Sequence, residues 1–225
     1  RGCPYSCTFC SASEWWQHKL RYRSIDNVIL EIQEIVKKYG IMDIYIGDDI
    51  FTYNKKRVYQ FCSNLKANGI EIRWTCLSRA DCVNYNLLKT MKEAGCREIS
   101  IGFESANNET LKIIGKGETI ETIQKTLFMC KEIGIQTRVT LIFGLPGEDE
   151  EKLLNTLSFL ETCRPNQIQL YSLAAYDGTM LFGDLEKFGI KIIYQNPQKW
   201  SRNVLDPMCE TKQLSRKDIT RIANI

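Results

Sequence analysis

Apolar residues alternate between helical and strand-like spacing from residue 25 to residue 173. In the first helical block, Val28, Ile29 and Ile32 lie on one stripe, and Gly40 supplies a stop. The predicted helices cover residues 25–39, 55–67, 86–94, 118–133 and 149–162. The predicted strands cover residues 42–47, 71–77, 97–103, 135–143 and 167–173. Such regular alternation favours an α/β fold built from right-handed βαβ units around a parallel sheet.

The predicted strands have one apolar face and one polar face. In residues 98–104 the odd-numbered positions are apolar, and the even-numbered positions are polar or small. A similar split separates Arg138 and Thr140 from Val139 and Leu141. Parallel strands covered on both faces usually form continuous apolar runs, and a TIM barrel fills its interior with branched apolar side chains. The polar face therefore favours a lumen that holds a ligand, with an open, solvent-facing sheet as the alternative.

The 225 residues carry a net charge of +3, and 44% of them are hydrophobic, which suits one substantial core such as a single α/β barrel. Basic residues are dispersed, and the densest group is only Lys55-Lys56-Arg57, so we expect no nucleic-acid partner. No apolar run approaches the roughly 20 residues that span a bilayer, and no basic-then-apolar leader opens the chain. The ten cysteines therefore indicate reduced thiols and metal ligands in a cytoplasmic protein.

Cys3, Cys7 and Cys10 stand at a spacing with few uses. A four-iron four-sulfur (4Fe-4S) cluster normally takes one thiolate for each iron. The local run supplies three thiolates, which would leave one iron open to a small molecule such as S-adenosylmethionine, bound through its amino and carboxylate groups. A zinc site with a fourth cysteine from elsewhere in the chain is the alternative, although zinc sites more often use two Cys-x2-Cys pairs.

With Phe9 before the last of these cysteines, the run resembles the radical S-adenosylmethionine (radical SAM) superfamily. Residues 21–32 look like the branch whose members often carry a cobalamin-binding domain before the radical domain. The resemblance covers residues 1–180 as a radical SAM core domain, and residues 181–225 form a C-terminal extension of unknown role. It implies a partial TIM-type barrel of six βα units. The first strand, and any cobalamin-binding domain, would then lie before Arg1.

The resemblance also implies which residues hold S-adenosylmethionine. Asp48 and Asp49 follow the first predicted strand, where the superfamily commonly has Gly-Gly-Glu. A carboxylate there accepts hydrogen bonds from the ammonium group of the cofactor. Asp49 is the better candidate, because it shares the inward face with Tyr45 and Gly47. Capping of the loop or of the next helix is the alternative for both acids.

Glu104 resembles the residue of the family that contacts the ribose hydroxyls, at the carboxyl end of an inward-facing row. A buried carboxylate without a partner is costly, so we expect a ligand or a cation beside it. Lys116 matches a position that is often basic in relatives. It pairs either with the cofactor carboxylate or with Glu104, and the sequence leaves both interpretations open.

Two arginines are candidates for the cofactor carboxylate, because the planar guanidinium suits that group. Arg79 follows a strand end and matches an arginine that is common in this branch. Arg138 lies within a strand, on its polar face. We favour Arg138 slightly, because an inward arginine on a strand needs an anion more than a loop arginine does.

The run from Gly144 to Glu148 matches a family motif at the turn after the fifth strand of the full fold. Its glycines would let the backbone approach the ligand closely, and Pro146 would stiffen the turn. Gly144 and Pro146 are therefore candidate cofactor-binding residues. At Asp177 the chain departs from the Pro-Gly-Thr of many relatives, which leaves the substrate side undefined.

The chemistry that the resemblance implies begins when a reduced cluster passes one electron to the sulfonium of S-adenosylmethionine. A carbon–sulfur bond then breaks and releases a 5′-deoxyadenosyl radical. A reductant of the flavodoxin or ferredoxin type would supply the electron. The radical would act on a small organic molecule, with cobalamin as a further cofactor in some relatives. Two alternatives stay open: a methylthiolating-like enzyme that modifies RNA, and a non-catalytic metal-binding scaffold.

Overall fold

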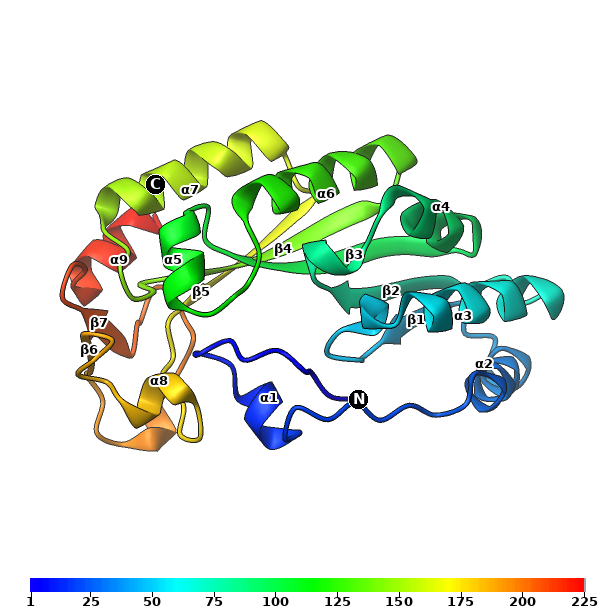
Figure 1. The fold of residues 1–225 in the computed structure, drawn as a ribbon, viewed down its shortest axis with the longest axis horizontal. Coiled ribbons are helices and arrows are strands. Elements are labelled where there is room, and N and C mark those ends of the chain that lie inside the picture. Colours follow the sequence, from blue (N-terminus) through cyan, green and yellow to red (C-terminus); the bar gives the residue numbers. More distant parts are fainter. Residues whose placement is uncertain (225) are drawn as a thin grey trace.

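A parallel five-stranded sheet forms the centre of the molecule, with its strands in the order β1-β2-β3-β4-β5 (Figure 1). The computed structural model describes residues 1–224. Each strand pairs with the next one along the chain, always in parallel. The strands are β1 (Asp43–Ile46), β2 (Arg73–Ser78), β3 (Cys96–Glu104), β4 (Gln136–Phe143) and β5 (Gln167–Ser172). The α/β fold expected from the sequence is confirmed.

Helices before and between the strands pack along one face of the sheet (Figure 1). Helix α2 (Ile25–Tyr39) and helix α3 (Lys55–Ala67) begin and end at the predicted residues. Ser24 caps α2 by accepting a hydrogen bond from the backbone of Asn27, and Gly40 ends the helix in the left-handed conformation. The other connecting helices are α4 (Tyr85–Glu93), α5 (Asn108–Ile113), α6 (Ile120–Ile133) and α7 (Glu150–Cys163).

The two faces of the sheet differ as the alternation predicted. In β4, Val139 and Leu141 are buried in the main core, whereas Arg138 and Thr140 on the opposite face are partly exposed. Within residues 1–224 the sheet does not close, because β1 and β5 are its two edges. The sheet is thus an arc of a barrel, and the connecting helices leave its polar face uncovered.

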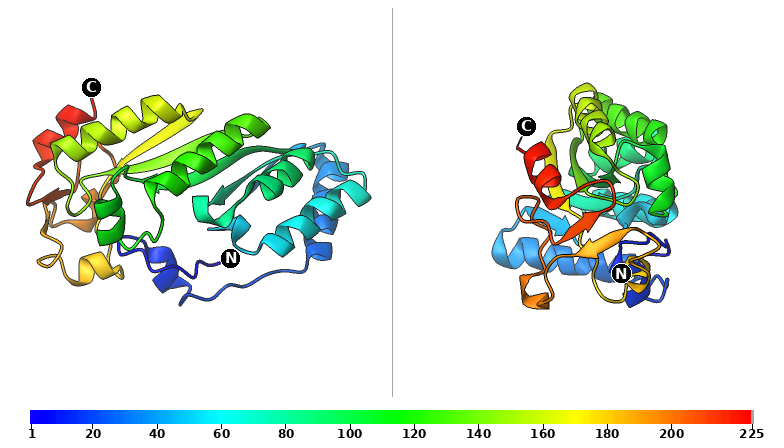
Figure 2. Two further views of the ribbon diagram at one scale, coloured as in Figure 1. Left: turned by 45° about the horizontal axis from the view of Figure 1, so that its top comes forward. Right: turned by 90° about the vertical axis from the view of Figure 1, so that its left-hand side faces the viewer.

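The N-terminal segment lies opposite the connecting helices, beside the segment that follows β5 (Figure 2). The two segments are tied together, because Leu181 N donates to Thr8 O at 2.9 Å. The sequence did not predict the short elements here, since a few residues show no clear period. They are α1 (Ser11–Trp15), α8 (Met180–Gly183), β6 (Ile190–Ile192), β7 (Cys209–Thr211), α9 (Arg216–Ile222) and the 3-10 turn Pro197–Lys199. Two further 3-10 turns, Phe51–Tyr53 and Ala80–Cys82, follow β1 and β2.

Residues 181–224 pack on the same fold as the rest of the chain. Leu181 and Met208 belong to the main apolar core. Ile219 and Ile222 of α9 pack with Phe143, the last residue of β4, in a smaller apolar cluster. The C-terminal extension therefore covers the end of the sheet near β4.

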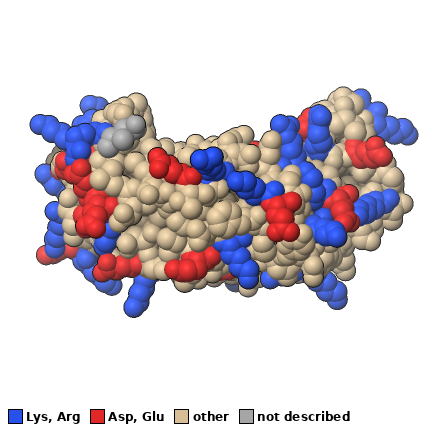
Figure 3. Space-filling model, turned by 90° about the horizontal axis from the view of Figure 1, so that it is seen from above, with Lys and Arg blue, Asp and Glu red and all other residues tan. Residues whose placement is uncertain are grey.

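Charged residues of both signs are interspersed on the face that carries α6 and α7, around an uncharged middle (Figure 3). The dispersed basic residues of the sequence do not gather into a stripe on this face. Among residues 1–224, no helix combines the length and the apolar character that crossing a membrane requires.

Gly95, between α4 and β3, provides a test of how closely this turn packs against Ile72, the residue before β2. Its φ is +91°, and a Cβ atom there would overlap the carbonyl oxygen of Ile72. We expect Gly95→Ala to lower the free energy of unfolding by about 3 kcal/mol or more, because the steric overlap adds to the backbone strain. Gly69→Ala is the matched control. Gly69 has a φ of +61° but no heavy atom within 4 Å of the added methyl group, so only about 1 kcal/mol of strain is expected.

Urea unfolding of both variants measures these changes. A loss at Gly95 no larger than the loss at Gly69 would contradict the packing described.

Candidate active site

Most of the residues predicted to bind the cofactor come together at the carboxyl ends of the strands. Asp48 and Asp49 follow β1, Arg79 follows β2, Glu104 ends β3, and the turn from Gly144 follows β4. In a parallel sheet the carboxyl ends of all the strands lie at the same end of the sheet. Barrel enzymes place their functional groups at this end.

Residues 1–10, here called the cysteine segment, are fixed at the same end of the sheet. Thr8 N donates to Ile114 O at 2.9 Å, in the loop between α5 and α6. Gly2, directly before Cys3, has a φ of +104°, and a Cβ atom there would overlap the carbonyl oxygen of Lys19. Only glycine therefore allows the segment to pass so close to the end of the α1 region.

The three thiols of this segment differ in their surroundings. Cys7 is buried, with 9% of its surface exposed, whereas Cys3 and Cys10 are half-buried. Burial raises the pKa of the Cys3 and Cys7 thiols. At Cys7 the positive charges of Lys116 and Arg79 oppose that rise. Two cations therefore face the most buried thiol and favour its thiolate form.

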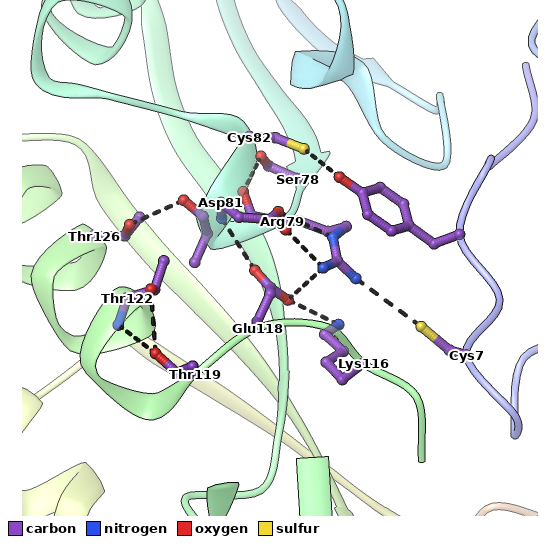
Figure 4. Close-up of polar contacts among 12 residues, drawn as sticks. Cys7, Ser78, Arg79, Asp81, Cys82, Lys116, Glu118, Thr119, Thr122 and Thr126 are labelled. Carbon is purple, nitrogen blue, oxygen red and sulfur yellow. Dashed lines mark hydrogen bonds and ion pairs between the residues drawn. The ribbon is translucent and has the colours of Figure 1, made fainter. Parts of the chain in front are cut away.

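Arg79 is held on several sides (Figure 4). Its Nε and Nη2 atoms donate to the two carboxylate oxygens of Asp81 at 3.0 and 2.8 Å, and Nη2 lies 3.6 Å from Glu118 Oε2. The guanidinium stacks over the Tyr5 ring at 3.6 Å. Its Nη1 atom donates to Cys7 Sγ at 4.0 Å. Burial would lower the pKa of Arg79, but the bond to Asp81 and the charge of Glu118 outweigh it and raise the pKa.

Lys116 is the second buried cation. Its Nζ atom donates to Glu104 Oε1 at 3.2 Å and lies 3.5 Å from Glu118 Oε2. Burial would lower the pKa of Lys116, but the charges of Glu104 and Glu118 outweigh it and raise the pKa. Of the two partners that the sequence left open for Lys116, the pair with Glu104 is present, and a role toward the cofactor carboxylate stays a prediction. The cation expected beside the buried Glu104 is therefore Lys116.

Gly102 makes room for this ion pair. The register between β3 and β4 shifts between Gly102 and Glu104, and Glu104 adopts a φ of +66°. A Cβ atom on Gly102 would lie 2.6 Å from Glu104 Oε1 and 2.8 Å from Lys116 Nζ. The bulge thus bends the Glu104 side chain back over Gly102, toward Lys116.

Asp48 and Asp49 contact the start of the cysteine segment. Asp49 Oδ2 accepts a hydrogen bond from Gly2 N at 3.0 Å. Asp48 Oδ1 lies 3.1 Å from the backbone nitrogen of Arg1. Both acids therefore hold the backbone that leads into Cys3, and their predicted role toward the cofactor ammonium stays a prediction.

The structure does not bring Arg138 together with the other predicted residues. Arg138 pairs with Gln167, the first residue of β5, so it lies toward the amino ends of the strands. Its Nη2 atom lies 2.9 Å from Glu98 Oε1. The anion that an inward arginine requires is thus a carboxylate of the chain itself, and of the two arginines only Arg79 lies at the carboxyl ends of the strands.

The turn after β4 encloses a buried carboxyl group. Ser105 Oγ donates to Glu148 Oε1 at 2.7 Å, and Leu145 N donates to Glu148 Oε2 at 3.1 Å. The space beside Gly144 is filled by Ile219, which a Cβ atom would approach to 2.8 Å. This glycine therefore admits a side chain of α9, a structural reason that the sequence did not reveal. Pro146 lies within the same turn.

Comparison with known proteins agrees with this arrangement. The family model of the Radical SAM superfamily matches residues 1–160. The chain belongs to this superfamily. Proteins of this superfamily use a 4Fe-4S cluster and S-adenosylmethionine, which are therefore the cofactors of this domain.

Several relatives of this radical SAM chain are methyltransferases or cyclases. It is 31% identical over 223 residues to an uncharacterized methyltransferase of Pyrococcus horikoshii, across 99% of this chain and 48% of the relative. It is 27% identical over 223 residues to the anaerobic magnesium-protoporphyrin IX monomethyl ester cyclase of Cereibacter sphaeroides, across 97% and 36% of the two chains. The chain thus spans about half the length of these relatives, or less.

The fold of the radical SAM chain is similar to that of TsrM, a radical S-adenosylmethionine methyltransferase from Kitasatospora setae. That structure was solved with cobalamin and a 4Fe-4S cluster bound. The TM-score is 0.73 at 20% sequence identity, and the match covers 87% of this chain and 39% of TsrM. This similarity of fold supports the partial TIM-type barrel that the sequence predicted for this chain.

The donor set of the cysteine segment fits the cluster better than a single ion. Among residues 1–224, no three His, Cys, Asp or Glu side chains converge as the ligands of one metal ion must. In a cluster each thiolate binds a different iron, so the sulfur atoms need not converge. Cys10 is near enough to Cys3 and Cys7 for its charge to raise both thiol pKa values, after the larger effect of burial.

Three residues of the radical SAM site were missed in the sequence: Tyr5, Asp81 and Glu118. Asp81 stands two residues after Arg79, and Glu118 stands two residues after Lys116. This charge spacing was the available signal. It is weak, because the same pattern occurs on solvated loops.

Replacing Lys116 tests whether the buried charges depend on one another. We expect Lys116→Met to lower the free energy of unfolding by about 3 to 5 kcal/mol, because Glu104 and Glu118 lose a buried cation. Adding Glu104→Gln should recover part of the loss by removing one uncompensated carboxylate. Lys66→Met, which breaks an exposed pair with Glu93, should change little. Urea unfolding measures all three variants, and equal losses at Lys116 and Lys66 would contradict the network.

Glu148 should make stability depend on pH. Burial raises the pKa of this carboxyl group from 4.5 to about 7. As the pH rises, the Glu148 carboxyl group therefore ionises in the unfolded chain before it ionises in the folded protein. The free energy of unfolding falls by about 3 kcal/mol between pH 4.5 and about 7. Glu148→Gln should abolish this loss, because a neutral amide can still accept from Leu145 N and donate to Ser105 Oγ. Unfolding measured from pH 4.5 to 8 checks this, and parallel pH profiles would contradict it.

Proposed function

We propose that this radical SAM core binds its cluster through Cys3, Cys7 and Cys10, and that the full-length protein acts on a small organic molecule. The observation that carries the proposal is the placement of the buried Cys7 thiol beside the buried cations Arg79 and Lys116, at the carboxyl ends of the strands. Barrel enzymes assemble their active sites at this end.

When bound, the reduced cluster supplies the electron that breaks a carbon–sulfur bond of S-adenosylmethionine and releases a 5′-deoxyadenosyl radical. The residues of the chain orient the reactants and keep water out. The buried pair of Glu104 and Lys116 gives that end of the sheet a fixed polar surface, to which we assign the ribose. Asp49 is assigned to the ammonium group of the cofactor.

The substrate is assigned to the uncovered polar face of the sheet. Thr140, Gln169 and Tyr171 lie on this face and are partly exposed, on neighbouring strands β4 and β5. A radical that removes a hydrogen atom needs its target held within van der Waals reach, which rigid strands provide. The polar lining suits a small molecule with hydrogen-bonding groups.

Methyl transfer or ring formation is the reaction class that we propose. The names of the relatives, methyltransferase and cyclase, support it. Cobalamin is proposed as a further cofactor, because TsrM binds it. We assign no residue of this chain to cobalamin, and its binding is proposed for the part of the full-length protein outside this chain.

A one-electron donor of the flavodoxin or ferredoxin type is proposed as the partner, in the cytoplasm. An RNA substrate is the second candidate. The interspersed charges over α6 and α7 do not favour it, since an RNA groove calls for clustered basic side chains.

The full-length protein, reconstituted anaerobically with ferrous iron and sulfide, tests the proposal. With dithionite and S-adenosylmethionine we expect 5′-deoxyadenosine, measured by chromatography. Cys7→Ala should lose both iron and product. Cys62→Ala is the matched control, because Cys62 of α3 is buried in the apolar core and should not be required for iron binding or for product formation. Added cobalamin should be needed for transfer of a methyl group but not for iron binding.

Zinc in place of iron, or full iron content in Cys7→Ala, would contradict the ligand assignment. Iron content without 5′-deoxyadenosine would contradict the reaction instead.

A further inference from the structure

The guanidinium of Arg79 is placed between carboxylates and a thiol. Its side chain is only 4% exposed, and its Nη1 atom donates to Cys7 Sγ at 4.0 Å (Figure 4). The other buried cation, Lys116, donates to Glu104 instead. Arg79 is therefore the cation that contacts the most buried of the three thiols.

The contacts of Arg79 leave its guanidinium one orientation. The two hydrogen bonds to Asp81 use the Nε and Nη2 edge, and Glu118 lies on the same side. Asp81 is itself held, because its backbone N–H donates to Glu118 Oε1 at 3.1 Å. The Tyr5 ring covers one face of the guanidinium plane. The Nη1 group is left to donate to the Cys7 thiol.

We infer that Arg79 is a positioning residue that raises the reduction potential of the cluster bound by Cys7. This inference rests on the cluster ligands proposed above. It assigns Arg79 to the thiolate of Cys7 and not to the carboxylate of S-adenosylmethionine, because Asp81 and Glu118 already satisfy the fork of the guanidinium.

The physical reason is the charge that reduction adds. When a reductant passes one electron to the cluster, its negative charge increases by one and spreads onto the cysteine sulfur atoms. A donor at a ligand sulfur stabilises this state more than the oxidised state, so the potential rises. Water screens this interaction little at Cys7, because the site is buried.

Arginine suits this task better than lysine. A planar guanidinium can bind a carboxylate along one edge and still donate from the other edge. An ammonium group in the same place would donate to Asp81 and Glu118 and point away from the Cys7 sulfur. The two hydrogen bonds to Asp81 therefore hold the guanidinium in the orientation in which its Nη1–H group contacts Cys7.

A redox titration of the reconstituted full-length protein without S-adenosylmethionine tests this inference, followed by the electron paramagnetic resonance signal of the reduced cluster. We expect the midpoint of Arg79→Gln to become more negative. At the wild-type midpoint the ratio of reduced to oxidised cluster should fall about tenfold, which for one electron equals 59 mV. Arg73→Gln is the control. Arg73 forms the same two-bond fork with Asp43, but at the amino ends of the strands, so the midpoint should not move.

An unchanged midpoint in Arg79→Gln at full iron content would overturn the inference while leaving the proposed function intact. A wild-type protein that binds no iron would overturn the proposed function first. If Arg79→Gln does not retain iron, Arg79→Lys is titrated instead. A midpoint more negative than that of the wild type supports the inference, and a midpoint equal to it overturns it.

Discussion

Compensation of buried charge is the constraint on which the rest of this site depends. Arg79 and Lys116 are almost fully buried, and each would be too costly there without an anion in contact. Glu118 lies between them, within 3.6 Å of Arg79 and 3.5 Å of Lys116. Asp81 and Glu104 complete the pairing on either side. This network keeps two positive charges beside a thiolate site without leaving either of them unpaired.

The parallel sheet is what brings these charges together. Asp81 follows β2, Glu104 ends β3, and Lys116 and Glu118 lie in the loop after α5, so the residues are distant in sequence. Their strands are neighbours in the sheet, and the parallel register aligns the carboxyl ends. The bulge at Gly102 then adjusts one side chain by the small amount that the pair with Lys116 requires. The register of the parallel strands therefore determines which charged residues meet at the site.

The uncovered face of the sheet completes the picture of a radical SAM core. Its helices lie on one side, whereas the cysteine segment and the C-terminal residues 181–224 lie near the carboxyl ends of the strands. The two edge strands β1 and β5 and the polar face between them form an arc of a barrel. Such an arc leaves room on its inner side for the cofactor and a small substrate, as proposed above.

The sequence by itself determined the five strands of the main sheet and the five helices α2, α3, α4, α6 and α7, because their apolar periods are regular, but not the short elements such as α5 and α9. It also made Cys3, Cys7 and Cys10 the candidate ligands of a cluster, since few other sites use that spacing. Which cation serves the site was decided only by tertiary structure. Arg138 and Arg79 were both candidates from the sequence, which slightly favoured Arg138, but strand register places Arg138 beside Glu98 and away from the thiols, while Arg79 reaches Cys7. Pairing between buried charges depends on contacts between segments far apart in the chain, and no local pattern of residues encodes them.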